Sequence, residues 1–207
     1  MSRPVIFNCE QGTPEWRECR RGIPTASKFS AILAKGRGGG ESLTRRTYMY
    51  DLAGEIITGE LASSYSSSDM DRGREMEAEA VAAYAFMKGV EPEEVGFIRN
   101  GRAGASPDRL LGSDGLLEIK TKKPALMIET ILRGDMPPEH RAQCQGQLWI
   151  SEREWVDIAV YWPGMPLFVH REARDPHFIA SLSKAVAEFN EELDAIVDRV
   201  RAYGAAA

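Results

Sequence analysis

The sequence predicts a single domain of the α/β (α+β) class, with helices and strands mixed along the chain. Its 207 residues are enough for one domain with a sizeable core, and no composition shift marks a boundary within residues 1–207. Three features predict the class. Residues 106–120 have the pattern of a β-hairpin, residues 155–161 and 167–170 that of a strand pair, and residues 176–203 that of a long amphipathic helix.

The segment from Ser106 to Lys120 gives the clearest local prediction. An apolar run ends at Leu111, a Gly-Ser-Asp-Gly sequence makes the turn, and a second apolar run returns. Side chains alternate along a strand, so Glu118 and Lys120 point to the same face. Asp108 lies near the start of the first strand, and the hairpin therefore brings it close to Glu118.

Two carboxylates and a lysine on a strand pair indicate a magnesium site with an amine beside it. Hard divalent cations prefer oxygen ligands, and Mg²⁺ usually takes one or two carboxylates together with water and phosphate. Each residue alone also has a structural reading, because an Asp after Ser-Pro often caps a turn and Glu-X-Lys often lies on a solvated face. The combination of Pro107-Asp108 with Glu118-X-Lys120 matches the PD-(D/E)XK nuclease pattern, which is more specific than its parts.

A further carboxylate lies on the apolar stripe of the helix expected over residues 71–88. Glu77, Val81 and Tyr84 have the spacing of one helix face. A carboxylate at such a position is unfavourable to bury unless it is paired or bound to a metal. Glu77 is therefore either a metal ligand or an edge residue that reaches water.

Arginines and hydroxyls surround a helix start near the beginning of the chain. Trp16 and Arg20 share a face of a first helix, and Thr25 and Ser27 stand at the start of a second. Basic side chains and hydroxyls around a helix N-terminus suit an anion such as phosphate. The alternative is that Thr25 and Ser27 only cap the helix.

The helix expected over residues 139–150 carries three glutamines. Gln143 and Gln147 lie on one face and Gln145 on another. Glutamines on a helix usually face solvent, but one can also hold a water molecule or a lysine ammonium. The three histidines have no metal-ligand spacing and are expected to be structural or on the surface.

Composition excludes several classes of protein. A net charge of −5 argues against a protein that coats nucleic acid along its length, although a local basic cleft is still possible. Three scattered cysteines cannot form a four-cysteine iron–sulfur site within the chain, and they fit a reducing compartment. The first residues lack the apolar core of a signal peptide and no run approaches a membrane span, so the expected location is the cytoplasm of a bacterial or phage-infected cell.

Four separated blocks resemble the phage lambda exonuclease family, also called the YqaJ-like viral recombinases, within the PD-(D/E)XK nucleases. The blocks are residues 16–27, residues 72–77, residues 106–108 together with 118–120, and residues 143–149. They span most of the chain in the family's order. The resemblance implies a restriction-endonuclease-like core, in which helices flank a central mixed β-sheet.

The resemblance also implies roles for individual residues. The implied metal ligands are Asp108, Glu118, Ile119 through its backbone carbonyl, and Glu77. The other implied catalytic residues are Lys120, which orients and helps to deprotonate the attacking water, and Gln143, which supports the site. The implied anchor for a terminal 5′-phosphate comprises Arg20, Thr25, Ser27 and Ser106. Nearby cations would push Lys120 toward its neutral form and the carboxylates oppose that shift, so its acid–base role is a hypothesis.

The implied activity is a magnesium-dependent exonuclease that digests one strand of linear duplex DNA from its 5′ end to mononucleotides. Its product is a 3′ overhang for recombination by strand annealing. The implied cofactors are two Mg²⁺ ions, with Mn²⁺ as a substitute. The implied partners are duplex DNA ends, two further copies of the chain in a homotrimeric ring, and a single-strand annealing protein. Two alternatives stay open: a PD-(D/E)XK endonuclease or DNA-repair nuclease, and a non-catalytic DNA-end-binding recombination adaptor.

Overall fold

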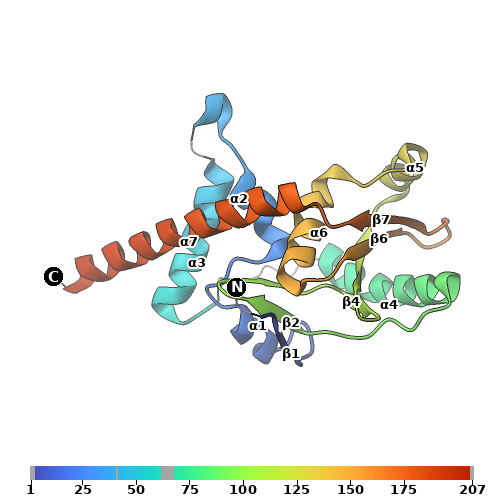
Figure 1. The fold of residues 1–207 in the computed structure, drawn as a ribbon, viewed down its shortest axis with the longest axis horizontal. Coiled ribbons are helices and arrows are strands. Elements are labelled where there is room, and N and C mark those ends of the chain that lie inside the picture. The colour runs from blue at the N-terminus through green and yellow to red at the C-terminus, as the bar shows by residue number, and fades with distance from the viewer. Residues whose placement is uncertain (1–2, 41, 62–67, 206–207) are drawn as a thin grey trace.

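The computed structural model describes residues 3–40, 42–61 and 68–205, and within them the chain has a mixed α and β architecture (Figure 1). The α-helices are α1 (Pro14–Arg20), α2 (Phe29–Leu33), α3 (Leu43–Thr58), α4 (Ser68–Lys88), α5 (Pro124–Arg133), α6 (Pro138–Ser151) and α7 (Pro176–Ala205). The strands are β1 (Val5–Phe7), β2 (Phe97–Asn100), β3 (Ala103–Ala105), β4 (Arg109–Leu111), β5 (Gly115–Thr121), β6 (Trp155–Tyr161) and β7 (Phe168–Ala173). Two short 3₁₀ helices are η1 (Ala26–Lys28) and η2 (Arg37–Gly39).

The predicted hairpin is confirmed as β4 and β5. Leu111 pairs with Gly115, so the turn occupies residues 112–114, and Gly112 supplies a positive φ of 55° there. The strand pair predicted near the C-terminus is also confirmed, as antiparallel β6 and β7. Strand β5 runs parallel to β6, and the connection between them contains α5 and α6.

The central mixed β-sheet that the resemblance implies is confirmed, and a second, smaller sheet accompanies it. Strands β4-β5-β6-β7 make a mixed sheet in that order, and β1-β2-β3 make a small antiparallel sheet. The strands of the small sheet have only three or four residues each, too few for a periodic pattern to be recognised. The mixed α and β class is nevertheless confirmed.

The mixed sheet has an apolar layer on each face. Leu116, Val156 and Ile158 project toward the main core, which they share with residues of α2, α3, α6 and α7. Leu117 and Ile119 project to the opposite face, where they pack with Ala80 and Tyr84 of α4 and other apolar groups. Because Glu118 lies between Leu117 and Ile119 in sequence, it points to the α6 side of the sheet together with Leu116.

The long helix α7 lies against α3, α2 and α6, and its C-terminal half extends beyond the sheets (Figure 1). Its apolar stripe supplies Leu182, Val186, Phe189 and Leu193 to the core, as the spacing predicts. No helix in the described ranges has both the length and the apolar character that crossing a bilayer requires.

Candidate active site

A cleft of about 170 Å³ collects most of the site residues that the sequence predicted. The predicted residues that line it are Arg20, Thr25, Ser27, Ser106, Asp108, Glu118 and Gln143. Gln11, Trp16, Ala26 and Gln147 complete its wall. The other predicted residues, Glu77, Ile119 and Lys120, are not part of this lining. The cleft therefore has an acidic end on the hairpin and a basic, hydroxyl-bearing end around η1.

The hairpin places the first two carboxylates opposite each other. Arg109 pairs with Leu117 in the antiparallel hairpin, so Asp108, one residue before Arg109, lies opposite Glu118, one residue after Leu117. The Asp108 Oδ2 atom accepts a hydrogen bond of 2.6 Å from the backbone N–H of Ile119. This bond fixes the Asp108 carboxylate to the neighbouring strand.

Glu118 is almost fully buried, with 2% of its surface exposed, and donors surround its carboxylate. The Oε1 atom accepts from Lys120 Nζ at 2.6 Å and from Gln143 Nε2 at 2.5 Å. The Oε2 atom accepts from Gln147 Nε2 at 2.5 Å. Gln143 thus occupies the supporting position that the resemblance implied, and Gln147 one turn later does the same for the second oxygen.

The acidic end is electrostatically crowded. Burial raises the pKa of Asp108 well above its ordinary value, and the nearby charges of Glu118 and Glu77 raise it further. Burial lowers the pKa of Lys120, but the Glu118 carboxylate and then Asp108 outweigh that effect, and the net pKa is raised. Lys120 is therefore held as an ammonium by the two carboxylates.

Glu77 lies at the margin of the acidic end. Its Oε1 atom accepts a hydrogen bond of 3.2 Å from Arg109 Nη1, and about a third of its side chain is exposed. Arg109 also donates to the backbone carbonyl of Asp108 at 2.5 Å. Glu77 is therefore an ion-paired residue beside the cleft, and its role as a metal ligand is still a prediction.

The donor set fits a hard divalent cation. In the described ranges no three His, Cys, Asp or Glu side chains are grouped closely enough to hold a metal by themselves. Mg²⁺ does not need such a cage, because it usually takes one or two carboxylates and keeps several waters. Burial, followed by the charges of Glu118 and Glu77, raises the pKa of Asp108, and a bound cation would favour its ionised form. Asp108 and Glu118 are the residues that would hold it.

The basic end is built around Arg20. Its guanidinium stacks on the ring of Trp16 at 3.8 Å from the centroid. Burial lowers its pKa, while Tyr48 and Glu55 act in the opposite direction. In the part of the chain that the structure describes, no carboxylate or carbonyl accepts a hydrogen bond from Arg20. Its N–H donors are thus available to an anion in the cleft.

Two hydroxyl groups extend the basic end. Ser106 Oγ accepts a hydrogen bond of 2.9 Å from Trp16 Nε1, which leaves its own O–H to donate elsewhere. Thr25 and Ser27 lie with their hydroxyl oxygens 3.4 Å apart. Thr25 precedes η1 but makes no side-chain capping bond, so the capping interpretation does not account for it. The helix predicted from Thr25 is the short turn η1 followed by the five-residue α2.

Two glycines let the basic end approach the rest of the site. A Cβ on Gly146 of α6 would overlap the ring of Phe29, directly after η1. A Cβ on Gly104 of β3 would overlap the ring of Phe97, and its N–H donates to Pro24 O at 3.0 Å. The absence of side chains at both positions allows α6 and β3 to pack closely around the η1 segment.

Four residues of the cleft wall are not among the site residues that the sequence predicts, and one of them, Ala26, contributes only a methyl group. Helix periodicity puts Gln147 on the face of Gln143 and Trp16 on the face of Arg20, but it assigns neither residue a role in the site. Gln11 carries no signal in the sequence; its Nε2 donates to Val95 O and Pro107 O, both at 2.9 Å. It thereby fixes the residue that precedes Asp108.

The third glutamine of α6 points away from the cleft, as its helical position predicts. Gln145 bonds Glu172, the carbonyl of Ala173 and the N–H of Asp175, where β7 leads into α7. The side chains of residues 68–75 lie outside the described part, so the block at residues 72–77 is represented by Met76 and Glu77 only.

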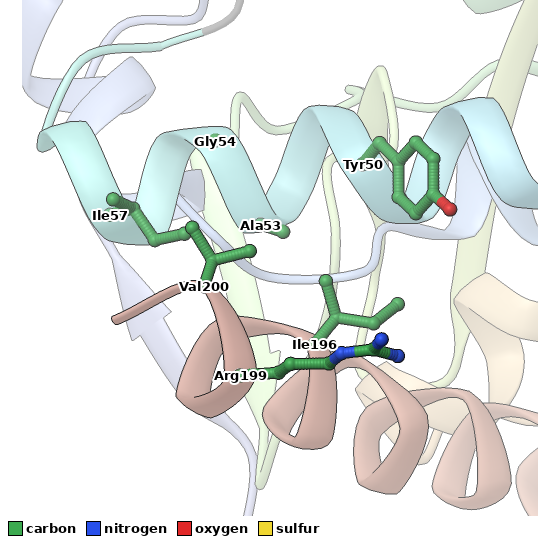
Figure 2. A pocket seen from close by; sticks show the side chains of 7 residues that line it. All are labelled: Tyr50, Ala53, Gly54, Ile57, Ile196, Arg199 and Val200. Carbon is green, nitrogen blue, oxygen red and sulfur yellow. The ribbon is translucent and has the colours of Figure 1, made fainter. Parts of the chain in front are cut away.

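A larger groove of about 370 Å³ lies between α3 and α7, and no residue of the hairpin lines it (Figure 2). Figure 2 shows Ile196 and Val200 projecting from α7 toward α3, which contributes Ile57 and Tyr50. No carboxylate lines this groove. It therefore lacks the groups for phosphodiester chemistry, and the smaller cleft is the candidate active site.

The fold and the Asp108…Glu118-X-Lys120 arrangement are those of the PD-(D/E)XK class of nucleases. The chain belongs to the YqaJ-like viral recombinase family, whose sequence model matches residues 15–154. This range contains every site residue predicted from the sequence. Membership supports a nuclease function.

Solved structures agree with this assignment. The chain is similar to the alkaline exonuclease LHK-Exo from Laribacter hongkongensis, with 32% identity and a TM-score of 0.83 over 93% of this chain and 98% of that one. LHK-Exo in complex with dAMP gives 34% identity and a TM-score of 0.85 over the same shares. A phage-related exonuclease from Haemophilus somnus 129PT has the same fold at 13% identity, with a TM-score of 0.65 over 86% of this chain and 96% of that one. The comparison with curated protein sequences found no match.

Proposed function

We propose that this protein is a Mg²⁺-dependent exonuclease that degrades one strand of linear duplex DNA from its 5′ end. The observation that carries the proposal is the single cleft that joins Asp108 and Glu118 to Arg20, Ser27 and Ser106. An endonuclease needs the acidic end but has no use for an arginine beside it that, among the described residues, stacks on Trp16 and donates to no carboxylate or carbonyl. A terminal phosphate seated at the basic end would place the adjoining phosphodiester near the carboxylates.

The chemistry follows from the positions of the chain's own groups. A bound cation supplies charge neutralisation at the scissile phosphate and an activated water. Asp108 and Glu118 would hold the cation, and Lys120, whose Nζ lies 2.6 Å from Glu118 Oε1, would orient the water. Water attacks phosphorus, the bond to the 3′ oxygen of the terminal nucleotide breaks, and that oxygen gains a proton. The new end again carries a 5′-phosphate, which can occupy the basic end in the next cycle.

The product of such a step is a 5′-mononucleotide, and the complex of LHK-Exo with dAMP shows that a relative of similar sequence binds one. Repeated cycles leave the other strand as a 3′ overhang, which is the substrate of a single-strand annealing protein. We propose further that three copies form a ring around duplex DNA, because a ring with a basic bore reconciles DNA binding with a net charge of −5. Light scattering that gives a monomeric mass at working concentration would contradict the ring.

The decisive experiment compares three DNA substrates of equal length: linear duplex with 5′-phosphate ends, linear duplex with 5′-hydroxyl ends, and a closed circle. We expect Mg²⁺-dependent release of mononucleotides, fastest from the phosphorylated ends, and none from the circle. Cleavage of the circle with indifference to end chemistry would favour the endonuclease alternative. Binding of ends without any release, in Mg²⁺ and in Mn²⁺, would favour the non-catalytic adaptor.

A further inference from the structure

Gln147 has no role in the proposed reaction, although it contacts the Glu118 carboxylate. It lies on α6 one turn after Gln143 and is 1% exposed. Gln143 and Gln147 donate to different oxygens of the same carboxylate, Oε1 and Oε2 of Glu118, each at 2.5 Å. Glu118 is thus held on both oxygens by one helix face.

The hydrogen-bond pattern leaves one position open on the Glu118 carboxylate. A carboxylate offers about four lone-pair positions. Lys120 and Gln143 occupy two on Oε1, and Gln147 occupies one on Oε2. The remaining position is on Oε2, the atom that Gln147 fixes. A cation bound by Glu118 would use this position as long as the three observed bonds persist.

The orientation of the Gln147 amide is set by Glu118. An ionised carboxylate only accepts hydrogen bonds, so the amide nitrogen must face it and the amide oxygen must face away. That oxygen is buried, and no donor in the described ranges reaches it. A buried acceptor without a hydrogen bond destabilises the folded protein. A methionine of similar length would fill the space without that cost, but it could not donate to Glu118.

We propose that Gln147 is a positioning residue that fixes Glu118 Oε2 and thereby sets the affinity of the site for its divalent cation. This inference rests on the proposed metal site. The buried amide oxygen of Gln147 has no hydrogen-bond donor among the described residues, which lowers stability, and the residue is explained by its contact with Glu118. Proteins accept such local losses of stability at functional sites. Gln143 also holds the Glu118 carboxylate, but it bonds Oε1, which Lys120 bonds as well. Gln147 is the sole side chain bonded to Oε2 among the described residues.

The test is calorimetric titration of the full-length protein with Mn²⁺ alone, without DNA. In Gln147→Met we expect about tenfold weaker binding, which corresponds to about 1.4 kcal/mol. The matched control is Gln145→Met, a buried glutamine of the same helix that contacts Glu172 and not Glu118. This control should lower the melting temperature and leave the Mn²⁺ affinity unchanged. Gln147→Asn, which keeps an amide but is too short to reach Oε2, should behave like Gln147→Met.

Digestion of linear duplex gives a second readout. In Gln147→Met the Mg²⁺ concentration at half-maximal rate should rise about tenfold, with most of the rate restored at saturating Mg²⁺. Folded Gln147 variants that bind Mn²⁺ as tightly as the parent would overturn the inference, as would an equal loss in Gln145→Met. A parent protein that binds Mn²⁺ but does not digest DNA refutes the proposed function alone, and the affinity difference between variants still decides the role of Gln147.

Discussion

The acidic and basic ends of the cleft are built in opposite ways. At the acidic end, Asp108, Glu118 and Lys120 all come from one hairpin, and two glutamines of α6 add hydrogen bonds to Glu118. At the basic end, Arg20 is positioned by Trp16, which in turn bonds Ser106, 90 residues away in sequence. Most acceptor positions of Glu118 are bonded within the chain, whereas Arg20 and Ser106 keep donors for a ligand. The difference indicates that the hairpin performs the chemistry and the long-range assembly selects where on the DNA it acts.

The largest expected effect is at Asp108. In Asp108→Asn we expect digestion of linear duplex to fall by about 10³-fold or more, because a ligand of the neutralising cation is lost. The raised pKa of Asp108 means that its stabilising contribution is present at low pH and is lost as the pH rises through the folded-state value. At pH 8 with a chelator, Asp108→Asn should therefore melt at or above the temperature of the parent.

The control for this variant is Asp114→Asn in the exposed turn of the same hairpin, which should keep both activity and melting temperature. An Asp108→Asn protein that is inactive and also less stable in chelator would show that Asp108 has a structural role. The assignment of a purely chemical role to Asp108 at the acidic end of the cleft would then be wrong.

The second effect concerns Arg20 and end selection. In Arg20→Ala we expect KM for 5′-phosphorylated duplex to rise about 10–100-fold, with little change for 5′-hydroxyl ends, since a charge-assisted contact contributes about 1.5–3 kcal/mol. Arg17→Ala, which removes an exposed arginine from the same helix, is the control. Equal losses on both types of end would assign Arg20 to general DNA attraction instead of the terminal phosphate.

A smaller effect tests the packing that joins the two ends. Gly146→Ala places a methyl group into the ring of Phe29, and such overpacking typically destabilises by about 1–3 kcal/mol. Gly54→Ala on α3, where nothing lies within 4 Å of the new Cβ, should instead stabilise by up to about 1 kcal/mol. Thermal melting measures both. We also expect Gly146→Ala to weaken the preference for 5′-phosphate, and an unchanged preference would mean that η1 does not depend on this contact.

The smallest effect is a pH dependence on the hairpin side of the cleft. Burial, assisted by Lys120 and Lys122, lowers the pKa of His140 to about 4. A depressed pKa means that its contribution to stability is present above the unfolded value near 6.5 and is lost as the pH falls toward 4. His140→Gln should lose less stability than the parent between those pH values, as measured by melting temperature. Parallel pH profiles for the two proteins would contradict a neutral, buried His140.

Much of the fold was predictable because hydrophobic periodicity and turn residues are properties of short segments of the chain. The hairpin, the pair β6 and β7, and helices α6 and α7 follow from periodicity and turn residues within each segment. Strands β1, β2 and β3 were missed since each has only three or four residues and is stabilised by pairing with distant segments. The same reason explains why the small second sheet has no signal in the sequence, whereas the central mixed sheet that the resemblance implies is present.

The sequence by itself determined the chemical groups of the site: Asp108 and Glu118 on facing strands, Lys120 beside them, and Gln143 on a helix. Only the tertiary structure decided how they are joined to Arg20, that Gln147 holds the second oxygen of Glu118, and that Glu77 is paired with Arg109. Strand and helix periods fix which side chains share a face within one element. They do not fix which elements meet, because that depends on packing between segments far apart in the chain, such as the contact that Gly146 permits with Phe29.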